Sequence, residues 1–399
     1  MKKIIKSAVL SSVVGSSLLA GITATKVDFS FDHLTADSSV WHKAETSEVT
    51  LYPQTTVKMN DKKANELNAN NVGKKAKVTV LYNGEEVAFL LRWKDETLNV
   101  QQGYRTDSYG DGFAVQLPTN YSNPTELPYI GMGSEGREVV VHLQKAAPNT
   151  FEPNGHGNVE LQVGRKNTIH FNENLKAFDN AVAKAGKVDY QRSFVSAGFR
   201  SMTEIKDGSS NFDMNMLYAM KPNCWKGILV RPVKDDYINL DGGAFPVAFA
   251  VWDGSKNNRD GMKLLSGWTS VDLPASGNED LVKELNTPVA GDVANGKAQY
   301  EMNCAACHLT KDIQMSVPFM APDLTNIGGY ASAGYIRESI VNPNAVVVPG
   351  YNRNAHRNTP WYNLDENGKR VSTMPDFSWM DEKSLNDLVA FLQTLKEEK

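Results

Sequence analysis

Two cysteines three residues apart are followed directly by a histidine: Cys304, Cys307 and His308, in the stretch NCAACH. This spacing can serve a covalently attached haem, a zinc ion or a redox disulfide. A structural zinc site needs a second close pair of Cys or His ligands, and none follows at ligand spacing. A thioredoxin-type disulfide opens a helix after a buried strand, whereas residues 292–303, before the motif, have a helical sequence.

A c-type haem is the interpretation that fits this motif. The two thiols of C-x-x-C-H add to the vinyl groups of the haem, and the adjacent imidazole is then held under the iron as its proximal ligand. We therefore predict one covalent haem c on Cys304 and Cys307, with His308 bound to the iron. The chain has only three cysteines, so a disulfide framework is not available. Cys224 is predicted to be buried and inert.

A haem that carries electrons needs a second axial ligand, and methionine in that place raises the reduction potential. The candidates are Met315, Met320, Met374 and Met380. Met374 precedes Pro375, which disfavours helical backbone at the residue before it and so stiffens the turn. The local sequence favours Met374 and does not exclude the other three.

Two helical patterns follow the motif. Ser332 can cap a helix that ends at Asn342-Pro343. After Asp381, apolar residues recur at helical spacing, at Leu385, Leu388, Val389, Leu392 and Leu395. Together with the helix before the motif, these patterns predict three helices around one haem.

This region resembles a class I cytochrome c domain, and we assign residues 289–399 to it. The matching stretches are GKAQYEMNCAACH, APDLTNIGGY, YIRESIVNPNAVVVPGY, TMPDF and LNDLVAFLQTL. The resemblance implies an all-α fold. It also implies that His308 and Met374 are the two axial ligands, which would leave Met315 and Met320 as packing residues.

The preceding part of the chain has the alternating pattern of β-strands. Residues 77–94 alternate apolar and polar side chains on both sides of Asn83-Gly84, which predicts a β-hairpin with a type I′ turn. Further alternating runs occupy residues 111–118, 137–144, 157–164, 225–233 and 245–254. Many short strands without long helices between them predict an antiparallel sandwich or barrel. A helical pattern at 172–187 is expected on its outside, and residues 273–288 read as a linker.

The strand-rich part, assigned to residues 25–272, resembles the haem b subunits of the ethylbenzene dehydrogenase type. The stretches that carry the resemblance are TVLYNGEEVAFLLRWKD, DGFAVQLP, PYIGMGSEGREVVVHLQKA and FPVAFAVWDGSKNNRDGMKLLSGW. These subunits belong to exported molybdenum enzymes related to dimethyl sulfoxide reductase. The resemblance implies a non-covalent haem b between Met132 and Lys263. A slip in the alignment would give a ligand role to Met262 or Lys256.

Other residues of the strand-rich part carry less specific expectations. The glycines on both sides of Met132 are expected to let the backbone approach a flat macrocycle. A lysine binds iron only as the neutral amine, so Lys263 must be desolvated. Trp93, Trp252 and Trp268 either line a haem pocket or fill the sandwich core, and core filling is favoured.

The first residues predict export. Lys2, Lys3 and Lys6 precede a small-residue apolar run that ends near Ile22, and residues 1–24 read as a signal peptide cleaved at Ala24. The run is shorter than the roughly 20 apolar residues of a membrane span. We therefore expect a periplasmic protein without a membrane span after cleavage. The net charge of -4 and the lack of a basic block exclude nucleic acid as a partner.

Together, these patterns predict a periplasmic dihaem electron-transfer protein and not an enzyme, because two six-coordinate irons leave no position for a substrate. The expected partners are the subunits of a molybdenum and iron–sulfur oxidoreductase. Electrons would be exchanged with a soluble cytochrome, a quinol-oxidising complex or a terminal oxidase. The alternative is a peroxidase-like haem enzyme or a haem-based sensor, either of which needs an open iron site.

Overall fold

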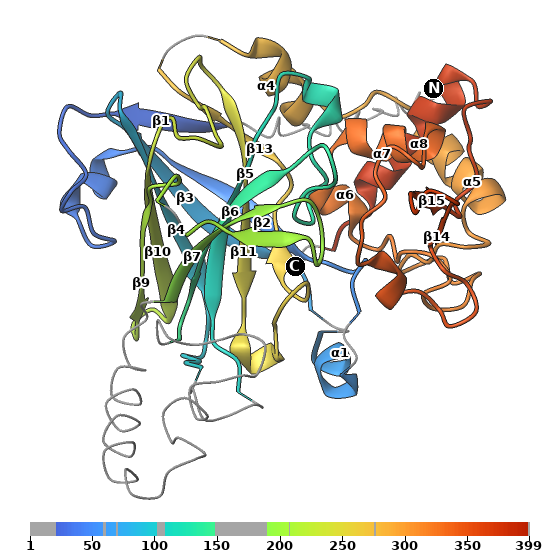
Figure 1. Ribbon diagram of the computed structural model, residues 1–399, viewed down its shortest axis with the longest axis horizontal. Helices are drawn as coiled ribbons and strands as arrows, with labels where there is room; N and C mark the ends of the chain where they lie inside the picture. Colours follow the sequence, from blue (N-terminus) through green and yellow to red (C-terminus); the bar gives the residue numbers. More distant parts are fainter. Residues whose placement is uncertain are drawn as a thin grey trace, which may run out of the picture.

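The computed structural model describes residues 21–58, 61–68, 71–101, 108–147, 190–206, 208–274 and 277–397. Within these ranges a strand-rich part is followed by a helical part that lies against one of its faces (Figure 1). The predicted strand at 157–164, the predicted helix at 172–187 and most of the predicted signal peptide lie outside the described residues.

Thirteen strands of the strand-rich part form one hydrogen-bonded sheet. Its main path runs β8-β7-β6-β5-β11-β12-β2-β3-β4-β10-β9, and β1 and β13 join at the side. The strands are β1 (Ile22–Lys26), β2 (Thr46–Pro53), β3 (Lys74–Tyr82), β4 (Glu86–Lys94), β5 (Gly112–Pro118), β6 (Val139–Lys145), β7 (Tyr190–Ser196), β8 (Met202–Glu204), β9 (Asp213–Ala219), β10 (Cys224–Pro232), β11 (Phe245–Trp252), β12 (Leu264–Leu265) and β13 (Thr269–Asp272).

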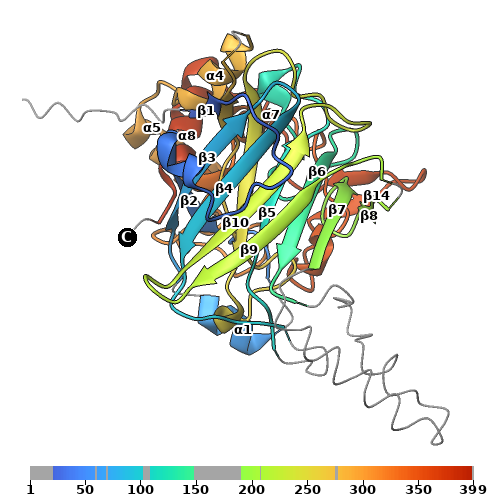
Figure 2. The same cartoon turned by 90° about the vertical axis from the view of Figure 1, so that its left-hand side faces the viewer.

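The path folds back so that its two halves face each other as the layers of a sandwich (Figures 1 and 2). Aromatic rings pack between the two layers. The ring centre of Phe89 in β4 lies 6.4 Å from that of Phe245 and 6.3 Å from that of Phe249, both in β11. The ring centre of Trp93 lies 5.8 Å from that of Phe113 in β5. The predicted sandwich is therefore confirmed. Trp93 fills its core, as expected.

Two details differ from the predicted antiparallel fold. Strand β1 pairs in parallel with both β3 and β13. The hairpin between β3 and β4 turns at Gly84 and Glu85, since the Asn83 N–H donates to the Glu86 carbonyl, and only Gly84 has a positive φ, of 104°. One positive φ at the first central position is the type II′ pattern and not the predicted type I′.

Strand β1 overlaps the predicted signal peptide. Ile22 and Ala24 are 1% and 3% exposed in the core of the sandwich. A cleavage after Ala24 would remove both residues, so the predicted boundary falls inside a strand that the fold uses.

The helical part consists of short helices and one small hairpin. The helices are α4 (Glu279–Asn286), α5 (Val293–Asn303), α6 (Ile327–Tyr330), α7 (Ala333–Val341) and α8 (Glu382–Thr394), and the hairpin is β14 (Tyr362–Leu364) with β15 (Arg370–Ser372). Elsewhere lie α1 (Lys62–Asn68) and the 3₁₀ helices η1 (Ser39–Lys43), η2 (Pro124–Glu126), η4 (Gly254–Lys256) and η5 (Tyr351–Arg353). The hairpin departs from the predicted all-α fold, and α4 occupies the predicted linker.

The three predicted helices are present, and Ser332 caps α7 as predicted. The Asp292 carboxylate accepts from the N–H groups of Ala294 and Asn295 at the start of α5. The Ser332 hydroxyl accepts from Tyr335 N–H at the start of α7, and Asp381 accepts from Ser384 N–H at the start of α8. Each cap satisfies a backbone N–H that has no partner within the helix.

Helices α5 and α8 cross at a glycine. A Cβ on Gly296 would collide with the carbonyl group of Asp387, so only glycine allows the two backbones to come this close. The ring of Tyr300 lies 5.5 Å from that of Phe391 one turn further along α5. This crossing fixes the position of the C-terminal end of α5, where the C-x-x-C-H motif begins.

We predict that Gly296→Ala lowers the free energy of unfolding by about 1–3 kcal/mol, because the added methyl group forces the helices apart. Chemical denaturation monitored by circular dichroism measures this change. Lys297→Ala alters the exposed neighbouring position and should change stability by less than about 0.5 kcal/mol. Equal effects of the two substitutions would contradict the close-packing explanation.

Candidate functional site

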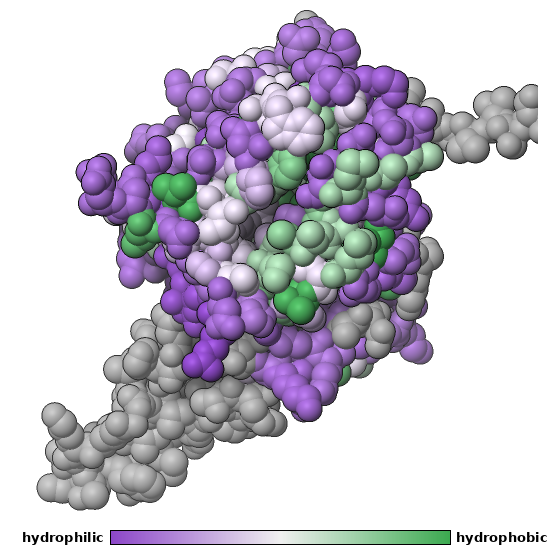
Figure 3. Space-filling view, turned by 90° about the vertical axis from the view of Figure 1, so that its right-hand side faces the viewer, coloured by the Kyte–Doolittle hydropathy of each residue, from purple (hydrophilic) through white to green (hydrophobic). Residues whose placement is uncertain are grey.

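The predicted haem c residues converge on one cavity of about 240 Å³ in the helical part. Cys304, Cys307, His308 and Met374 all line it. Figure 3 looks onto this side of the molecule and shows a hollow bordered in part by hydrophobic surface. The structure thus brings together the four residues that the sequence predicted for one haem site.

The His308 ring is oriented by the backbone. Its Nδ1 lies 2.8 Å from the carbonyl oxygen of Pro322, which can only accept, so Nδ1 carries the proton. The other ring nitrogen, Nε2, is then unprotonated and is the atom that can bind a metal. Burial lowers the pKa of His308 and favours the neutral imidazole that metal binding requires.

The two thiols do not have the character of a redox pair. Burial, together with the nearby Cys307, raises the pKa of Cys304 to about 12. A catalytic C-x-x-C cysteine instead has a lowered pKa, because the thiolate is the reactive form. Both thiols are free and face the cavity, which fits covalent attachment of a group bound there.

Met374 follows the β14–β15 hairpin. The N–H of Met374 donates to the Ser372 hydroxyl at 3.1 Å, and the N–H of Thr373 donates to the Trp361 carbonyl at 3.0 Å. Together with Pro375, these bonds hold the thioether at the cavity wall. The hairpin that positions Met374 has no signal that sequence reasoning used, although Asn367-Gly368 marks its turn.

The other candidate methionines differ in whether they line the cavity. Met320 also lines the cavity, whereas Met380 is buried outside it and Met315 is 67% exposed. Geometry therefore leaves Met374 and Met320 as the methionines of the described residues that can reach a group in this cavity.

The cavity also receives side chains from the strand-rich part. Thr56, which follows β2, and Tyr129 line it beside Tyr335 and Tyr351. The Tyr129 ring lies 5.1 Å from that of Tyr335 and 5.8 Å from that of Tyr351, and its hydroxyl is 3.3 Å from the Thr56 hydroxyl. Sequence reasoning did not identify Tyr129, because its role depends on how the two parts pack.

A second, smaller cavity of about 30 Å³ lies over the outer face of β5 and β11. Met132 and Lys263 both line it. The remaining lining residues are Ala114, Gln116, Ile130, Val141, Ala248, Phe249, Ala250, Trp252, Leu265 and Ser266. The alanines at 114, 248 and 250 present only small side chains on this part of the sheet face.

Lys263 has an uncompensated amine. The side chain is 6% exposed, and its Nζ has no hydrogen-bond partner. Burial lowers the pKa of Lys263 to about 8, although Asp260 opposes the shift. The nearest aromatic group is the Trp252 ring, whose centre is 5.6 Å from Nζ. Burial thus brings the neutral amine, the form that can bind a metal, closer to physiological pH.

Met132 sits in a strained turn. It has a φ of 75°, which is uncommon for a residue with a side chain. The Gly133 N–H donates to the Tyr129 carbonyl at 2.8 Å, and the Ser196 hydroxyl donates to the Met132 carbonyl at 2.7 Å, so the turn is held from both sides.

The structure gives a further reason why glycine is needed on both sides of Met132. A Cβ on Gly131 would collide with the Tyr129 ring, and Gly133 has a φ of 77° with the Ser196 carbonyl 2.8 Å from where its Cβ would be. Packing within the protein, and not only access to a macrocycle, requires these glycines.

The alternative ligands do not reach this cavity. Met262 is buried and its sulfur accepts from the Asn68 amide at 3.0 Å, and Lys256 lies on a different pocket of the surface. Trp252 lines the cavity and is also a buried member of the hydrophobic cluster between the sheet and the helical part. Its ring also lies 5.5 Å from the Lys145 amine, a second lysine whose pKa burial lowers to about 8.

Two further predictions concern parts of the chain outside the cavities. Cys224 is half-buried at the start of β10, where its side chain is not covered by the core, so the predicted full burial was wrong. In the described part of the chain, no helix has both the length and the apolar character to cross a bilayer.

One short segment joins the two cavities. Tyr129 lines the larger cavity and Met132 the smaller one, three residues further along the chain. Ile130, between them, also lines the smaller cavity. The two candidate sites are therefore neighbours, although most of their other residues come from different domains.

The helical part is held on the strand-rich part by polar bonds around an apolar contact. Arg137 forms a two-bond ion pair with Glu338 of α7, with N–O distances of 2.6 and 2.7 Å. The Asn326 amide donates to the Pro53 carbonyl at 3.2 Å, and the Lys58 N–H donates to the Asn354 amide oxygen at 2.9 Å.

The sequence matches two known families. The ethylbenzene dehydrogenase family matches residues 38–263, more than half of the chain, and the cytochrome c family matches residues 293–396. The chain belongs to the ethylbenzene dehydrogenase family, and it continues into a cytochrome c domain, which implies a haem c. The predicted multidomain fold and the two family resemblances are thereby confirmed.

A curated relative is the chlorate reductase subunit gamma of Ideonella dechloratans. It is 24% identical over 242 residues, which cover 59% of this chain and 77% of the relative.

Solved structures show only weak likeness. A putative carbohydrate-binding protein from Bacteroides uniformis is 8% identical, with 64% of this chain and 99% of that chain covered and a TM-score of 0.30. A carbohydrate binding module of family 9 from Caldicellulosiruptor kristjanssonii, in complex with glucose, is 9% identical, with 65% and 97% covered and a TM-score of 0.27. Such low scores carry no functional meaning.

We predict that Arg137→Ala lowers the free energy of unfolding by about 1–2 kcal/mol, because it leaves the half-buried Glu338 carboxylate without its two charged hydrogen bonds. Denaturant titration measures the change. The matched control is Lys94→Ala, which removes the 2.7 Å pair with Glu96, where the side chains are 73% and 65% exposed. Lys94→Ala should lower the free energy of unfolding by less than about 0.5 kcal/mol. Equal decreases in the two variants would contradict a docking role for Arg137.

Proposed function

We propose that this chain is a periplasmic dihaem electron-transfer subunit of a molybdenum oxidoreductase complex. Its relative in Ideonella dechloratans is a gamma subunit of a reductase, and the family match with the cytochrome c domain supports an electron-transfer role and not a catalytic one. The observation that carries the proposal is the buried, unpartnered Lys263 amine, which shares a cavity with Met132.

In the larger cavity, Cys304 and Cys307 would hold haem c covalently, and His308 and Met374 would bind its iron. The orientation of His308 by Pro322 and the placement of Met374 after the hairpin support this assignment. The haem supplies a reversible one-electron couple. The protein supplies the ligands, a largely apolar wall and the exclusion of a free iron position, since a bound thioether leaves no place for substrate.

In the smaller cavity, Met132 and Lys263 would bind the iron of one non-covalent haem b. A buried amine without a hydrogen-bond partner is costly unless it binds something, and the family resemblance implies that the partner is a haem iron. The cavity of about 30 Å³ is much smaller than the one around His308, so a macrocycle fits only when its lining side chains move apart.

The segment from Tyr129 to Met132 gives the two sites a direct connection through the protein. It is buried, and its turn is fixed by Ser196 and by the packing of Tyr129 against Tyr335 and Tyr351. The two haems would then be neighbours, with this segment between them. The helical domain would then exchange electrons with a soluble cytochrome, a quinol-oxidising complex or a terminal oxidase, while the strand-rich domain contacts the molybdenum and iron–sulfur subunits.

Export to the periplasm rests on the first residues. Because Ile22 and Ala24 are buried in β1, we place the cleavage before Ile22 and not at Ala24. Sequencing of the mature N-terminus tests this: a chain that starts upstream of Ile22 is expected, and a start at Thr25 would contradict it.

We predict that Lys263→Ala changes only the haem b spectrum and Met374→Ala only the haem c spectrum. Each substitution removes an axial ligand, so the affected iron becomes high-spin while the other stays low-spin. Pyridine haemochrome analysis of the purified protein should show one haem b and one haem c per chain, and absorption and magnetic circular dichroism spectra report the spin states.

The chain offers a matched control for each substitution. Lys256→Ala removes a nearby lysine that does not line the haem b cavity, and Met315→Ala removes an exposed methionine. Neither should alter the spin state of a haem. A spectrum that stays unchanged in Lys263→Ala or Met374→Ala removes that ligand assignment. Carbon monoxide binding to both haems of the unaltered protein would instead support the peroxidase-like or sensor alternative.

The partner assignment has its own test. Affinity capture of the full-length protein from the periplasm of its native host should bring down large subunits that contain molybdenum and iron–sulfur clusters. Metal analysis of the captured complex identifies them. Capture of the chain alone under conditions that preserve the complex of a known relative would contradict the proposal.

A further inference from the structure

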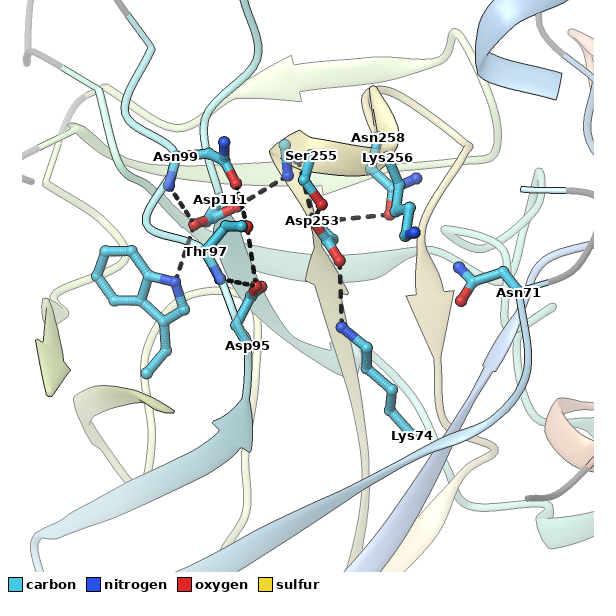
Figure 4. Close-up of polar contacts among 12 residues, drawn as sticks. Asn71, Lys74, Asp95, Thr97, Asn99, Asp111, Asp253, Ser255, Lys256 and Asn258 are labelled. Atoms are coloured by element: carbon cyan, nitrogen blue, oxygen red, sulfur yellow. Dashed lines mark hydrogen bonds and ion pairs between the residues drawn. The ribbon is translucent and has the colours of Figure 1, made fainter. Parts of the chain in front are cut away.

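Three aspartates meet at one end of the sandwich, and none of them lines either haem cavity (Figure 4). Asp95 directly follows β4, Asp111 directly precedes β5 and Asp253 directly follows β11. They are 3%, 0% and 5% exposed. One carboxylate oxygen of each lies within 4.8 Å of the others. Since these three strands belong to both layers, the cluster forms where the layers come together.

Hydrogen bonds hold two of the carboxylates in place. Asp111 accepts from the N–H groups of Asn99 and Gly254 at 2.8 Å and from the Trp225 indole at 3.0 Å. Asp253 accepts from the Ser255 N–H at 3.0 Å and forms an ion pair with Lys74 at 3.2 Å. Backbone N–H groups from the β4–β5 connection and from the segment after β11 thus orient these two carboxylates.

The third carboxylate is incompletely satisfied. One oxygen of Asp95 accepts from the N–H and hydroxyl of Thr97, at 3.2 and 3.3 Å. The other, Oδ2, is buried and has no hydrogen-bond partner. In Figure 4 the Asp95 carboxylate points toward Asp111 and Asp253. A buried, charged oxygen without a partner carries a large desolvation penalty unless a ligand binds it.

The charges of the cluster do not balance. Lys74 is the cation paired with it, and its side chain is 29% exposed at the rim. Burial raises the pKa of Asp111 to about 7, and burial together with Asp253 raises the pKa of Asp95. Three buried carboxylates thus share one ion pair, with a lysine at the rim. A divalent cation would supply what Lys74 alone does not.

We propose that Asp95, Asp111 and Asp253 bind a calcium ion. The donors are all oxygens, which suits a hard cation and not zinc or copper. Calcium–oxygen distances of 2.3–2.6 Å place opposite ligands about 4.6–5.2 Å apart, whereas the 2.0–2.1 Å of magnesium requires about 4.2 Å. The carboxylate oxygens all lie within 4.8 Å of one another, which is compatible with one shared ion. Three carboxylates from the protein suit calcium better than magnesium, which usually keeps several waters and binds through one or two carboxylates.

The site would brace the floor of the smaller cavity. Asp253 is the residue after Trp252, and Asp111 directly precedes β5, the strand that carries Ala114. Trp252 and Ala114 both line that cavity. An ion bound to β4, β5 and β11 at this end would join the two layers of the sandwich. The calcium site does not depend on the identity of the haem ligands.

The test uses the purified, full-length, haem-loaded protein. After treatment with EGTA and dialysis against a low concentration of calcium chloride, the protein should retain about one calcium per chain by mass spectrometry of the metal. Calcium should also raise the melting temperature of the sheet by several degrees, because a ligand that binds only the folded state stabilises it. Magnesium at the same concentration should have little effect.

Asp95→Asn is the informative variant. The amide oxygen can still accept from Thr97, and the loss of one like charge relieves repulsion, so in EGTA the variant should melt at or above the temperature of the unaltered protein. Its affinity for calcium should fall by at least about tenfold, because affinity follows the number of charged ligands. The matched control is Asp272→Asn, since Asp272 also has a buried oxygen without a partner but lies outside the cluster.

Three results would overturn the proposal: no calcium retained by the unaltered protein, an equal response to magnesium, or an unchanged calcium affinity in Asp95→Asn. Loss of binding in Asp272→Asn to the same degree would also overturn it, because the effect would then not be specific to the cluster. Both haem spectra serve as a check that each variant is folded.

Discussion

The apolar contact between the sheet and the helical part is the interaction on which the rest of the structure depends. Strands β5 and β11 are buried along their whole length, because one face packs in the sandwich core and the other is covered from outside. The covering residues include Tyr330, Ile336 and Leu392 of the helical part. Without this contact Tyr129 would not reach the larger cavity, and the two candidate sites would not be neighbours.

The same contact explains why small side chains are found on the outer face of β11. Alanines at 248 and 250 alternate there with the large core residues Phe249 and Val251 on the inner face. The outer face of β11 therefore carries only short side chains at these two positions beside the smaller cavity. A lysine amine placed over such a surface has lost its water without gaining a protein partner, and this imbalance is what makes Lys263 suited to bind a metal-containing group.

Strain and charge imbalance occur at separate places in the sandwich. The positive φ of Met132 is held by hydrogen bonds from Ser196 and by the packing of Tyr129, so the turn is fixed before any group binds. The carboxylates of Asp95, Asp111 and Asp253 are likewise fixed by the loops around them. In both cases the stability of the surrounding fold offsets the unfavourable free energy of the strained turn or of the buried carboxylates.

The sequence by itself determined the local features. The C-x-x-C-H spacing, the helices capped by Ser332 and Asp381, and the alternating strands around residue 83 could all be predicted, since each depends on side chains a few residues apart. The choice of Met132 and Lys263 came only from the family resemblance, and the type I′ turn and the burial of Cys224 were wrong because neighbouring strands decide them. Only the tertiary structure placed Tyr129 beside the cytochrome cavity, Trp252 beside Lys263 and three distant aspartates together. Those meetings depend on how the two layers and the helical domain pack, and no local pattern encodes long-range packing.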